Sequence, residues 1–119
     1  MIGGCTGEDI LNSVEVFDIE TQEWTFGPSM STPRSGVKAV VYRQKIFVLG
    51  GLDGDQRLRS VECLDMTQPR PVWSQAADMI TPRDCFGACV IDDRILVMGG
   101  FTGNGATNKA ETYSGDKGV

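Results

Sequence analysis

The chain has 119 residues, of which 40% are apolar and 23% are charged, the size and composition of one small globular domain. Eleven basic and sixteen acidic residues give a net charge of −5 with no block of like charges, which argues against nucleic acid and anionic membranes as partners. No apolar run approaches the roughly 18 residues that a membrane-spanning helix needs. We therefore expect a soluble protein with no nucleic-acid partner and no membrane partner.

The sequence contains no histidine, which excludes Ser-His-Asp and Cys-His catalysis and His-containing metal sites within this chain. Its cysteines, Cys5, Cys63, Cys85 and Cys89, form no C-x-x-C pair. We interpret them as reduced, small apolar side chains, with a disulfide or a thiolate site as the alternative. The prediction is a chain with no catalytic residue, no metal and no cofactor, in a reducing compartment, the cytoplasm.

In chain order, short β-rich runs alternate with glycine and proline. The first runs cover residues 14–17 and 23–26. Residues 37–42 and 45–49 then follow with only two residues between them, the spacing of a tight hairpin, and Asp92-Asp93 joins a second such pair. No stretch has a sustained 3.6-residue apolar period, so we predict antiparallel strands throughout.

The chain also repeats itself. Diglycines at 3–4, 50–51 and 99–100 are spaced by 47 and then 49 residues. Aligning residues 24–51 with 73–100 without a gap gives 11 identities in 28 positions. The recurring anchors are Trp24 and Trp73, Met30 and Met79, Thr32-Pro33-Arg34 and Thr81-Pro82-Arg83, and Ser13-Val14-Glu15 and Ser60-Val61-Glu62, with Glu111 at the place of a third glutamate.

A diglycine, a Ser-Val-Glu strand, a tryptophan and Met-x-x-Pro-Arg in this order resemble Kelch repeats, in particular the propeller part of BTB-Kelch proteins. The resemblance implies an all-β fold, a partial Kelch-type β-propeller of four-stranded antiparallel blades. We expect two complete or nearly complete blades plus a partial third. The Kelch-repeat region then spans 1–119, with a first unit at 1–50 that starts inside a strand, a second at 50–99 and a partial third at 99–119.

The repeated residues fit structural roles in such a fold. Each diglycine is expected where an inner strand ends and a Cβ atom would clash. Trp24 and Trp73 are expected to fill wedges between blades, and Glu15 and Glu62 to accept hydrogen bonds from Arg34 and Arg83 or from backbone N–H groups. The predicted structural anchors are Gly3, Gly4, Glu15, Trp24, Gly50, Gly51, Glu62, Trp73, Gly99 and Gly100.

The same resemblance implies where a partner binds. In peptide-binding Kelch proteins, the loop after each diglycine and the loop holding the arginine line one mouth of the channel. An arginine there suits a carboxylate or phosphate, whereas Asp84 weakens that preference. The alternative for Arg34 and Arg83 is that each pairs with a repeat glutamate and braces its blade. The predicted partner-binding residues are Arg34, Ser35, Leu52, Arg57, Arg83, Asp84 and Phe101, with Cys5 at the equivalent place in the first loop.

These observations predict a non-enzymatic protein–protein interaction module that presents propeller loops to a protein or peptide. Substrate recruitment for a cullin-type ubiquitin ligase is the expected role in a full-length parent; the alternatives are an actin-binding Kelch protein and, less favoured, a blade fragment of a Kelch-fold metalloenzyme. About 2.4 units do not close a ring, so further Kelch blades are needed, from the same parent chain or from other copies. We favour the fragment of a longer propeller.

Overall fold

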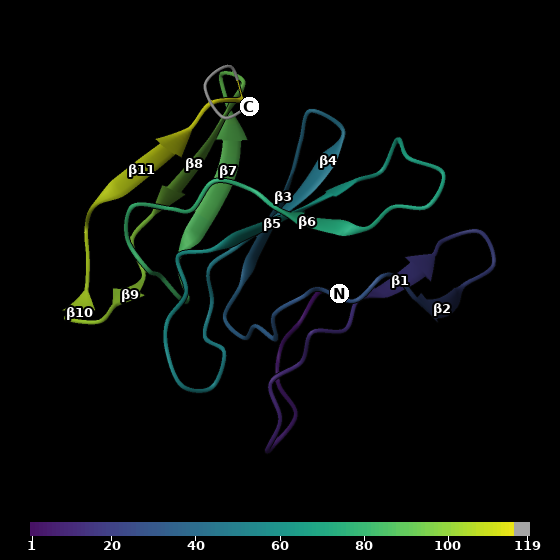
Figure 1. The fold of residues 1–119 in the computed structure, drawn as a ribbon, viewed down its shortest axis with the longest axis horizontal. Helices are drawn as coiled ribbons and strands as arrows, with labels where there is room; N and C mark the ends of the chain where they lie inside the picture. The colour runs from purple at the N-terminus through teal and green to yellow at the C-terminus, as the bar shows by residue number, and fades with distance from the viewer. Residues whose placement is uncertain (116–119) are drawn as a thin grey trace.

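The structure, a computed structural model, describes residues 1–115, so the end of the predicted third unit, 116–119, lies outside it. All its named elements are β-strands, arranged in separate antiparallel sheets that follow one another around the molecule (Figure 1). The first sheet pairs β1 (Glu15–Asp18) with β2 (Glu23–Phe26). The second has the order β3 (Lys38–Tyr42), β4 (Lys45–Leu49), β5 (Val61–Asp65), β6 (Trp73–Gln75). The third has the order β11 (Ala110–Tyr113), β8 (Arg94–Met98), β7 (Gly87–Ile91), and β9 (Phe101–Thr102) pairs with β10 (Gly105–Ala106) in a short ribbon.

This architecture confirms the prediction of an all-β, partial propeller fold. The sheets are offset from the diglycine units, because the diglycines at 50–51 and 99–100 each follow the second strand of a sheet. One sequence unit therefore supplies the last two strands of one sheet and the first two strands of the next. In the described residues the three successive sheets have two, four and three strands.

The two predicted hairpins form as expected. Arg43 and Gln44 between β3 and β4 have φ of 50° and 64°, and Asp92 and Asp93 between β7 and β8 have φ of 50° and 55°. Two consecutive positive φ values match the right-handed twist of the flanking strands. The hairpins set the register in which Phe47 lies opposite Val40, which keeps the apolar side chains of both strands on the same face.

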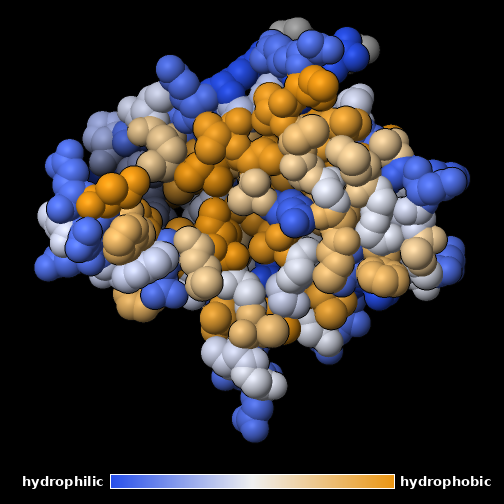
Figure 2. Space-filling model, turned by 180° about the vertical axis from the view of Figure 1, so that it is seen from behind, coloured by the Kyte–Doolittle hydropathy of each residue, from blue (hydrophilic) through white to orange (hydrophobic). Residues whose placement is uncertain are grey.

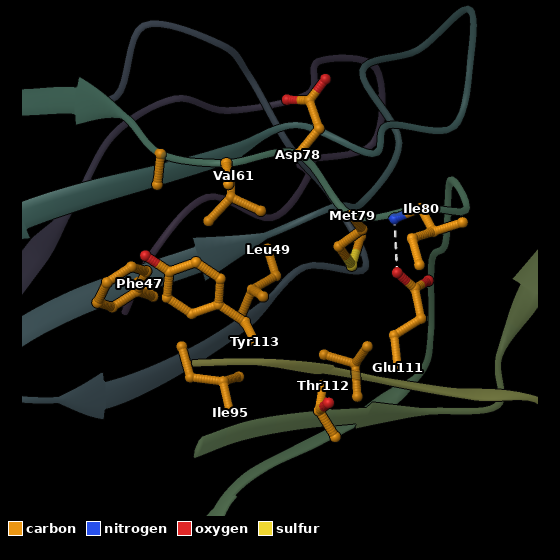
Figure 3. A pocket seen from close by; sticks show the side chains of 13 residues that line it. Phe47, Leu49, Val61, Asp78, Met79, Ile80, Ile95, Glu111, Thr112 and Tyr113 are labelled. Atoms are coloured by element: carbon orange, nitrogen blue, oxygen red, sulfur yellow. Dashed lines mark hydrogen bonds between the residues drawn. The ribbon is translucent and has the colours of Figure 1, made fainter. Parts of the chain in front are cut away.

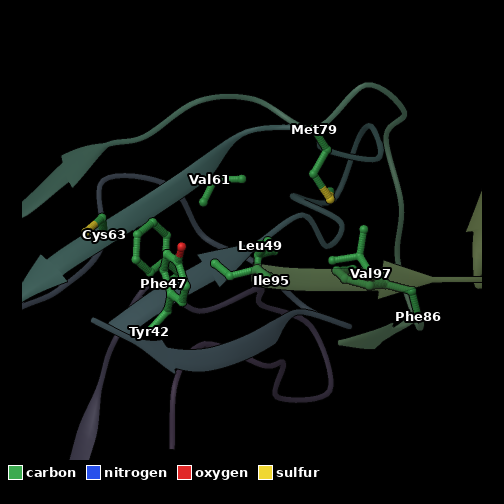
Figure 4. Close-up of a cluster of buried hydrophobic side chains, with 9 residues drawn as sticks. All are labelled: Tyr42, Phe47, Leu49, Val61, Cys63, Met79, Phe86, Ile95 and Val97. Atoms are coloured by element: carbon green, nitrogen blue, oxygen red, sulfur yellow. The ribbon is translucent and has the colours of Figure 1, made fainter. Parts of the chain in front are cut away.

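The core lies between the sheets, because side chains alternate along each strand. On β4, Phe47 and Leu49 join a cluster with Ile95 and Val97 of β8, between the second and third sheets (Figure 4). Val48 points the other way and is fully buried in a second cluster toward the first sheet. The second sheet thus contributes both of its faces to the core, as a blade between two neighbours requires.

In each diglycine at least one glycine lies where two backbones approach closely, although a Cβ atom at Gly4 would meet no atom within 4 Å. Gly50 has φ of +61°, and a Cβ atom there would be 2.6 Å from the carbonyl oxygen of Arg83. Gly51 has φ of +94°, and its Cβ atom would be 2.6 Å from the carbonyl oxygen of Ser35. Only glycine satisfies both conditions at these positions without displacing the neighbouring chain.

The two tryptophans differ, and the structure corrects the placement of Trp24. Trp73 packs against the cluster between the first and second sheets, and its Nε1 donates a hydrogen bond to the carbonyl oxygen of Pro28 at 2.7 Å. Trp24 is 57% exposed and touches Phe17, with ring centroids 5.1 Å apart. The surface that receives Trp73 belongs to the preceding sheet, and no sheet within the described residues precedes the one that carries Trp24.

Apolar side chains are also visible on the surface. Figure 2 shows them gathered over the centre of the face opposite to that of Figure 1, with hydrophilic side chains toward the periphery. Exposed large apolar residues occur on β1 and β2 and on the outward side of the third sheet, among them Phe17, Trp24, Ile91 and Met98. Exposure of this kind marks surfaces suited to further contacts.

Candidate functional site

Three loops that each follow a diglycine project from the same end of the sheets, opposite the β3–β4 and β7–β8 turns (Figure 1). They cover residues 4–11, 51–58 and 100–107. The first is closed by an isolated bridge between Cys5 and Ile10, and the third contains the β9–β10 ribbon. The rigid sheets below hold these loops in place, which is how propellers present variable binding surfaces.

Five of the predicted partner-binding residues form a continuous series of contacts across this end. Backbone hydrogen bonds of 2.9 and 2.8 Å join Ser35 to Leu52, and a β-bridge joins Leu52 to Arg57. The Nε atom of Arg57 donates to Oδ1 of Asp84 at 2.5 Å, and backbone hydrogen bonds of 3.1 and 3.0 Å join Asp84 to Phe101. We call these five residues the loop row.

The loop row offers an apolar side chain beside an ion pair. Phe101 is 47% exposed, whereas the side chains of Arg57 and Asp84 are 35% and 13% exposed. Since the carboxylate of Asp84 neutralises Arg57, this pair presents polar hydrogen-bonding groups with little net charge. The row suits a partner that buries an apolar side chain on Phe101.

Arg34 lies beneath the row and not on it. Its side chain is fully buried, and its Nε donates to Oε2 of Glu62 at 3.1 Å. Its Nη1 donates to the carbonyl oxygens of Gly50 and Ser60, and the backbone N–H groups of Ser31 and Thr32 donate to the same carboxylate. This arrangement corresponds to the alternative in which the arginine pairs with a repeat glutamate and braces its blade. Every polar group of the guanidinium is directed into the protein.

Arg83 repeats the arrangement in the third sheet. Its Nε donates to Oε2 of Glu111 at 3.1 Å, and Nη1 donates to the carbonyl oxygens of Gly99 and Lys109. Its side chain is 1% exposed. Neither Arg34 nor Arg83 presents a guanidinium to a partner in this structure, so the expected affinity for acidic or phosphorylated peptides loses its main support.

The structure assigns each arginine its glutamate partner. Arg34 pairs with Glu62 and not with Glu15, and Arg83 pairs with Glu111 and not with Glu62. The reason is the offset between units and sheets: each arginine enters a new sheet and meets the glutamate of that sheet's third strand. Within the described residues, no side chain pairs with the Glu15 carboxylate. The constant spacing of 28 residues between arginine and glutamate is the sequence signal for this pairing.

Exposed carboxylates around the row are a feature that the sequence analysis did not single out. Glu8 and Asp9 lie in the first loop and Asp55 in the second, all exposed. In the second loop, backbone N–H groups of Gln56 and Asp55 donate to Asp53, which lowers the pKa of its carboxyl group and keeps it ionised. That these acids lie at the same end of the sheets follows from the arrangement of the loops in the structure.

The described residues hold no group of three or more His, Cys, Asp or Glu side chains arranged to bind a metal ion. All four cysteines are free, Cys63 buried and the other three exposed. No helix long and apolar enough to cross a membrane occurs in residues 1–115.

Comparison with known proteins agrees with the geometry. Residues 1–116 match the family described as the KLHDC2/KLHL20/DRC7 Kelch-repeats domain. The chain belongs to the Kelch-repeat family. This membership, with the relatives described next, supports a protein-interaction module.

Several curated proteins are similar to parts of the Kelch-repeat chain. Kelch-like protein 8 of Mus musculus is 35% identical over 65 residues, 54% of this chain and 10% of that protein. The influenza virus NS1A-binding protein homolog of Xenopus laevis is 40% identical over 52 residues, 44% of this chain and 8% of that protein. Alpha-scruin of Limulus polyphemus is 46% identical over 43 residues, 36% of this chain and 5% of that protein. The matched segments thus span a tenth or less of these relatives.

Proposed function

We propose that this Kelch-repeat chain binds a protein partner through the loop row and that Phe101 is the centre of the contact. The observation that carries the proposal is the continuity of the row: residues from four separate segments are joined by backbone bridges and one ion pair at a single end of the sheets. A surface held in this way loses little entropy on binding. An exposed aromatic residue such as Phe101 is the type of side chain that dominates protein interfaces.

The partner's chemistry follows from the exposed groups. With Arg34 and Arg83 buried, and with Glu8, Asp9 and Asp55 exposed around the row, the surface disfavours an acidic or phosphorylated segment. A neutral or basic segment with one apolar side chain fits better. A relative named as a binder of a viral protein is in keeping with a protein ligand.

A photo-crosslinking amino acid at position 101 tests the proposal, and Ile19, 82% exposed on the β1–β2 turn, is the matched control position. We expect position 101 to capture a discrete partner from cell extract, and we expect Phe101→Ala to weaken binding of that partner at least tenfold, as for a central aromatic contact. Ile19→Ala should leave binding unchanged. Equal capture from both positions, or unchanged binding by Phe101→Ala, contradicts the proposal.

For the full-length parent, we propose substrate recruitment to a cullin-type ubiquitin ligase in preference to actin binding. The resemblance of the repeats to the propeller part of BTB-Kelch proteins, described from the sequence, supports this choice. We expect a cullin to co-purify with the full-length parent from cytoplasm. We also expect ubiquitination of the captured partner to depend on Phe101. If the chain co-sediments with filamentous actin and Phe101→Ala abolishes this co-sedimentation, the ligase proposal is contradicted.

A further inference from the structure

The apolar cavity between the second and third sheets belongs to the packing between blades. Figure 3 shows Leu49, Val61 and Met79 directed into it, and at one end the carboxylate of Glu111 accepts a hydrogen bond from the backbone N–H of Ile80. Chemistry that neither the core nor the loop row uses lies elsewhere, in the loop of residues 100–107.

The tip of that loop carries an asparagine followed by a glycine. Strands β9 and β10 meet at a turn in which Gly103 and Asn104 lie between the two strands (Figure 1). Asn104-Gly105 is the only Asn-Gly pair in the sequence. Both residues are exposed, and a Cβ atom on Gly103 or on Gly105 would meet no atom within 4 Å. The tip is therefore open to solvent.

Little holds the Asn104 side chain in place. Its backbone N–H donates to Oγ1 of Thr102 at 3.3 Å, but its side-chain amide makes no hydrogen bond within residues 1–115. The side chain of Asn12, in contrast, donates to the carbonyl oxygen of Met30 at 3.1 Å. Only two residue pairs join β9 to β10, so the turn can open at little cost. The amide carbon of Asn104 can therefore approach the backbone nitrogen of Gly105.

This placement permits a reaction between the two residues. A hydroxide ion takes the proton of the Gly105 N–H, and the nitrogen bonds to Cγ of Asn104. The Cγ–Nδ2 bond breaks, and Nδ2 leaves as ammonia with a proton from water. The cyclic succinimide then takes up one water molecule. Attack of water at Cγ gives aspartate, whereas attack at the main-chain carbonyl carbon gives isoaspartate, in which the chain continues through Cγ.

We propose that Asn104 is a site of spontaneous conversion to aspartate and isoaspartate, with water as the co-reactant, and that isoaspartate separates β9 from β10. Isoaspartate lengthens the main chain by one carbon atom, so the pairing of Gly105 with Thr102 and of Ala106 with Phe101 is lost. Both products also place a carboxylate where the amide was neutral. Because Phe101 belongs to the loop row, the conversion alters the surface assigned to the partner, a consequence that rests on the proposed function.

The second loop contains a comparable pair that the structure protects. Asp53 precedes Gly54, and an aspartate forms the same cyclic product when its carboxyl group is protonated. Its Oδ1 accepts hydrogen bonds from the backbone N–H groups of Gln56 at 3.0 Å and Asp55 at 2.9 Å, which lower the pKa of the carboxyl group. An ionised carboxylate resists attack by a backbone nitrogen. In the folded chain, isoaspartate should therefore form at position 104 and not at position 53.

Timed incubation of the full chain at pH 8, followed by peptide mass mapping and labelling with an isoaspartyl methyltransferase, measures conversion at each position. We expect Asn104 to convert at least about tenfold faster than Asn12 or Asn108, because each of those is followed by a residue with a Cβ atom beside the attacking nitrogen. Asn104→Gln should remove the fast conversion, since a longer side chain must close a larger ring. Asn108→Gln, also in an exposed position, is the matched control and should leave it unchanged.

Hydrogen exchange of the converted chain tests the structural effect, and exchange over residues 102–106 should become faster than in the fresh chain. Conversion at Asn104 no faster than at Asn108, equal isoaspartate at Asp53, or unchanged exchange over residues 102–106 overturns the inference. These readouts need no partner, so this inference and the proposed function can fail separately. The protein captured through position 101 should bind the converted chain more weakly than the fresh chain, and incubation of Asn104→Gln should not change its binding.

Discussion

Arg34 and Glu62 lie 28 residues apart in sequence and form a fully buried ion pair, with Nη2 and Oε2 3.1 Å apart. The pair ties the segment that enters the second sheet to the third strand of that sheet. Arg83 and Glu111 have the same spacing of 28 residues and the same geometry in the third sheet. The second and third sheets are therefore each closed by an internal ion pair between an arginine below the loop row and the glutamate of the third strand.

Removing the first of these ion pairs should destabilise the fold strongly. Arg34→Ala leaves the Glu62 carboxylate buried without its counter-charge, for which a loss of about 3–5 kcal/mol in the free energy of unfolding is expected. Arg59→Ala is the control, because the Arg59 side chain is 59% exposed and should change stability by less than about 0.5 kcal/mol. Urea denaturation measures both, and equal midpoints for the two variants contradict this role of the ion pair.

The two tryptophans should differ in their contribution to stability. Trp73→Ala removes an indole packed between sheets and its hydrogen bond to Pro28, so we expect a loss of about 3 kcal/mol. Trp24→Ala should cost about 1 kcal/mol or less, since that ring is mostly exposed and touches Phe17. Thermal unfolding followed by circular dichroism distinguishes them. A larger loss for Trp24 would show that its ring is covered in solution.

Glycine at position 50 should be irreplaceable by alanine. Gly50→Ala introduces a Cβ atom 2.6 Å from the Arg83 carbonyl oxygen at a positive φ, so a loss of more than about 1 kcal/mol is expected. Gly103→Ala meets no atom within 4 Å and serves as the control. Denaturant midpoints compare the two, and a tolerated Gly50→Ala would mean that the two backbones are not in close contact.

Acid should weaken the contact between the two hairpin turns. Arg43 donates to Asp93 across the second and third sheets, which lowers the pKa of the Asp93 carboxyl group below its usual value of 3.8. The Asp93 carboxylate therefore takes up a proton at a higher pH in the unfolded chain than in the folded chain. The stabilisation is complete above about pH 4 and is lost as pH falls through the lower, folded pKa. Asp93→Asn should flatten this dependence in denaturation curves between pH 5 and pH 2.5; an unchanged curve contradicts it.

The cysteines should react with iodoacetamide at different rates. Burial raises the pKa of the Cys63 thiol above its usual value of 9.0, and the side chain is inaccessible, so it should react last. Cys85 is exposed, but desolvation and the neighbouring Asp84 raise its pKa as well. We expect Cys5 and Cys89 to be modified first at pH 8, by mass spectrometry of timed samples. Early modification of Cys63 would place it at the surface.

Much of the fold could be predicted from the sequence because short local motifs, such as two-residue turns and diglycines, mark the repeat. The two-residue joins at Arg43-Gln44 and Asp92-Asp93 predicted the hairpins, and each diglycine marked a close approach of two backbones. The binding loops were placed by family resemblance, and five of the seven predicted partner-binding residues came together in one row. Whether that row binds a partner stays a prediction.

The amino-acid sequence alone determined the strand content, the repeat period and the residues that recur, because turn geometry and alternation act over a few neighbouring positions. Only the tertiary structure decided which residues of different units meet. It paired Arg34 with Glu62, and it packed Trp73 between two sheets while leaving Trp24 exposed. Each of these outcomes depends on a neighbouring sheet, and a repeat by itself does not reveal which surfaces have one.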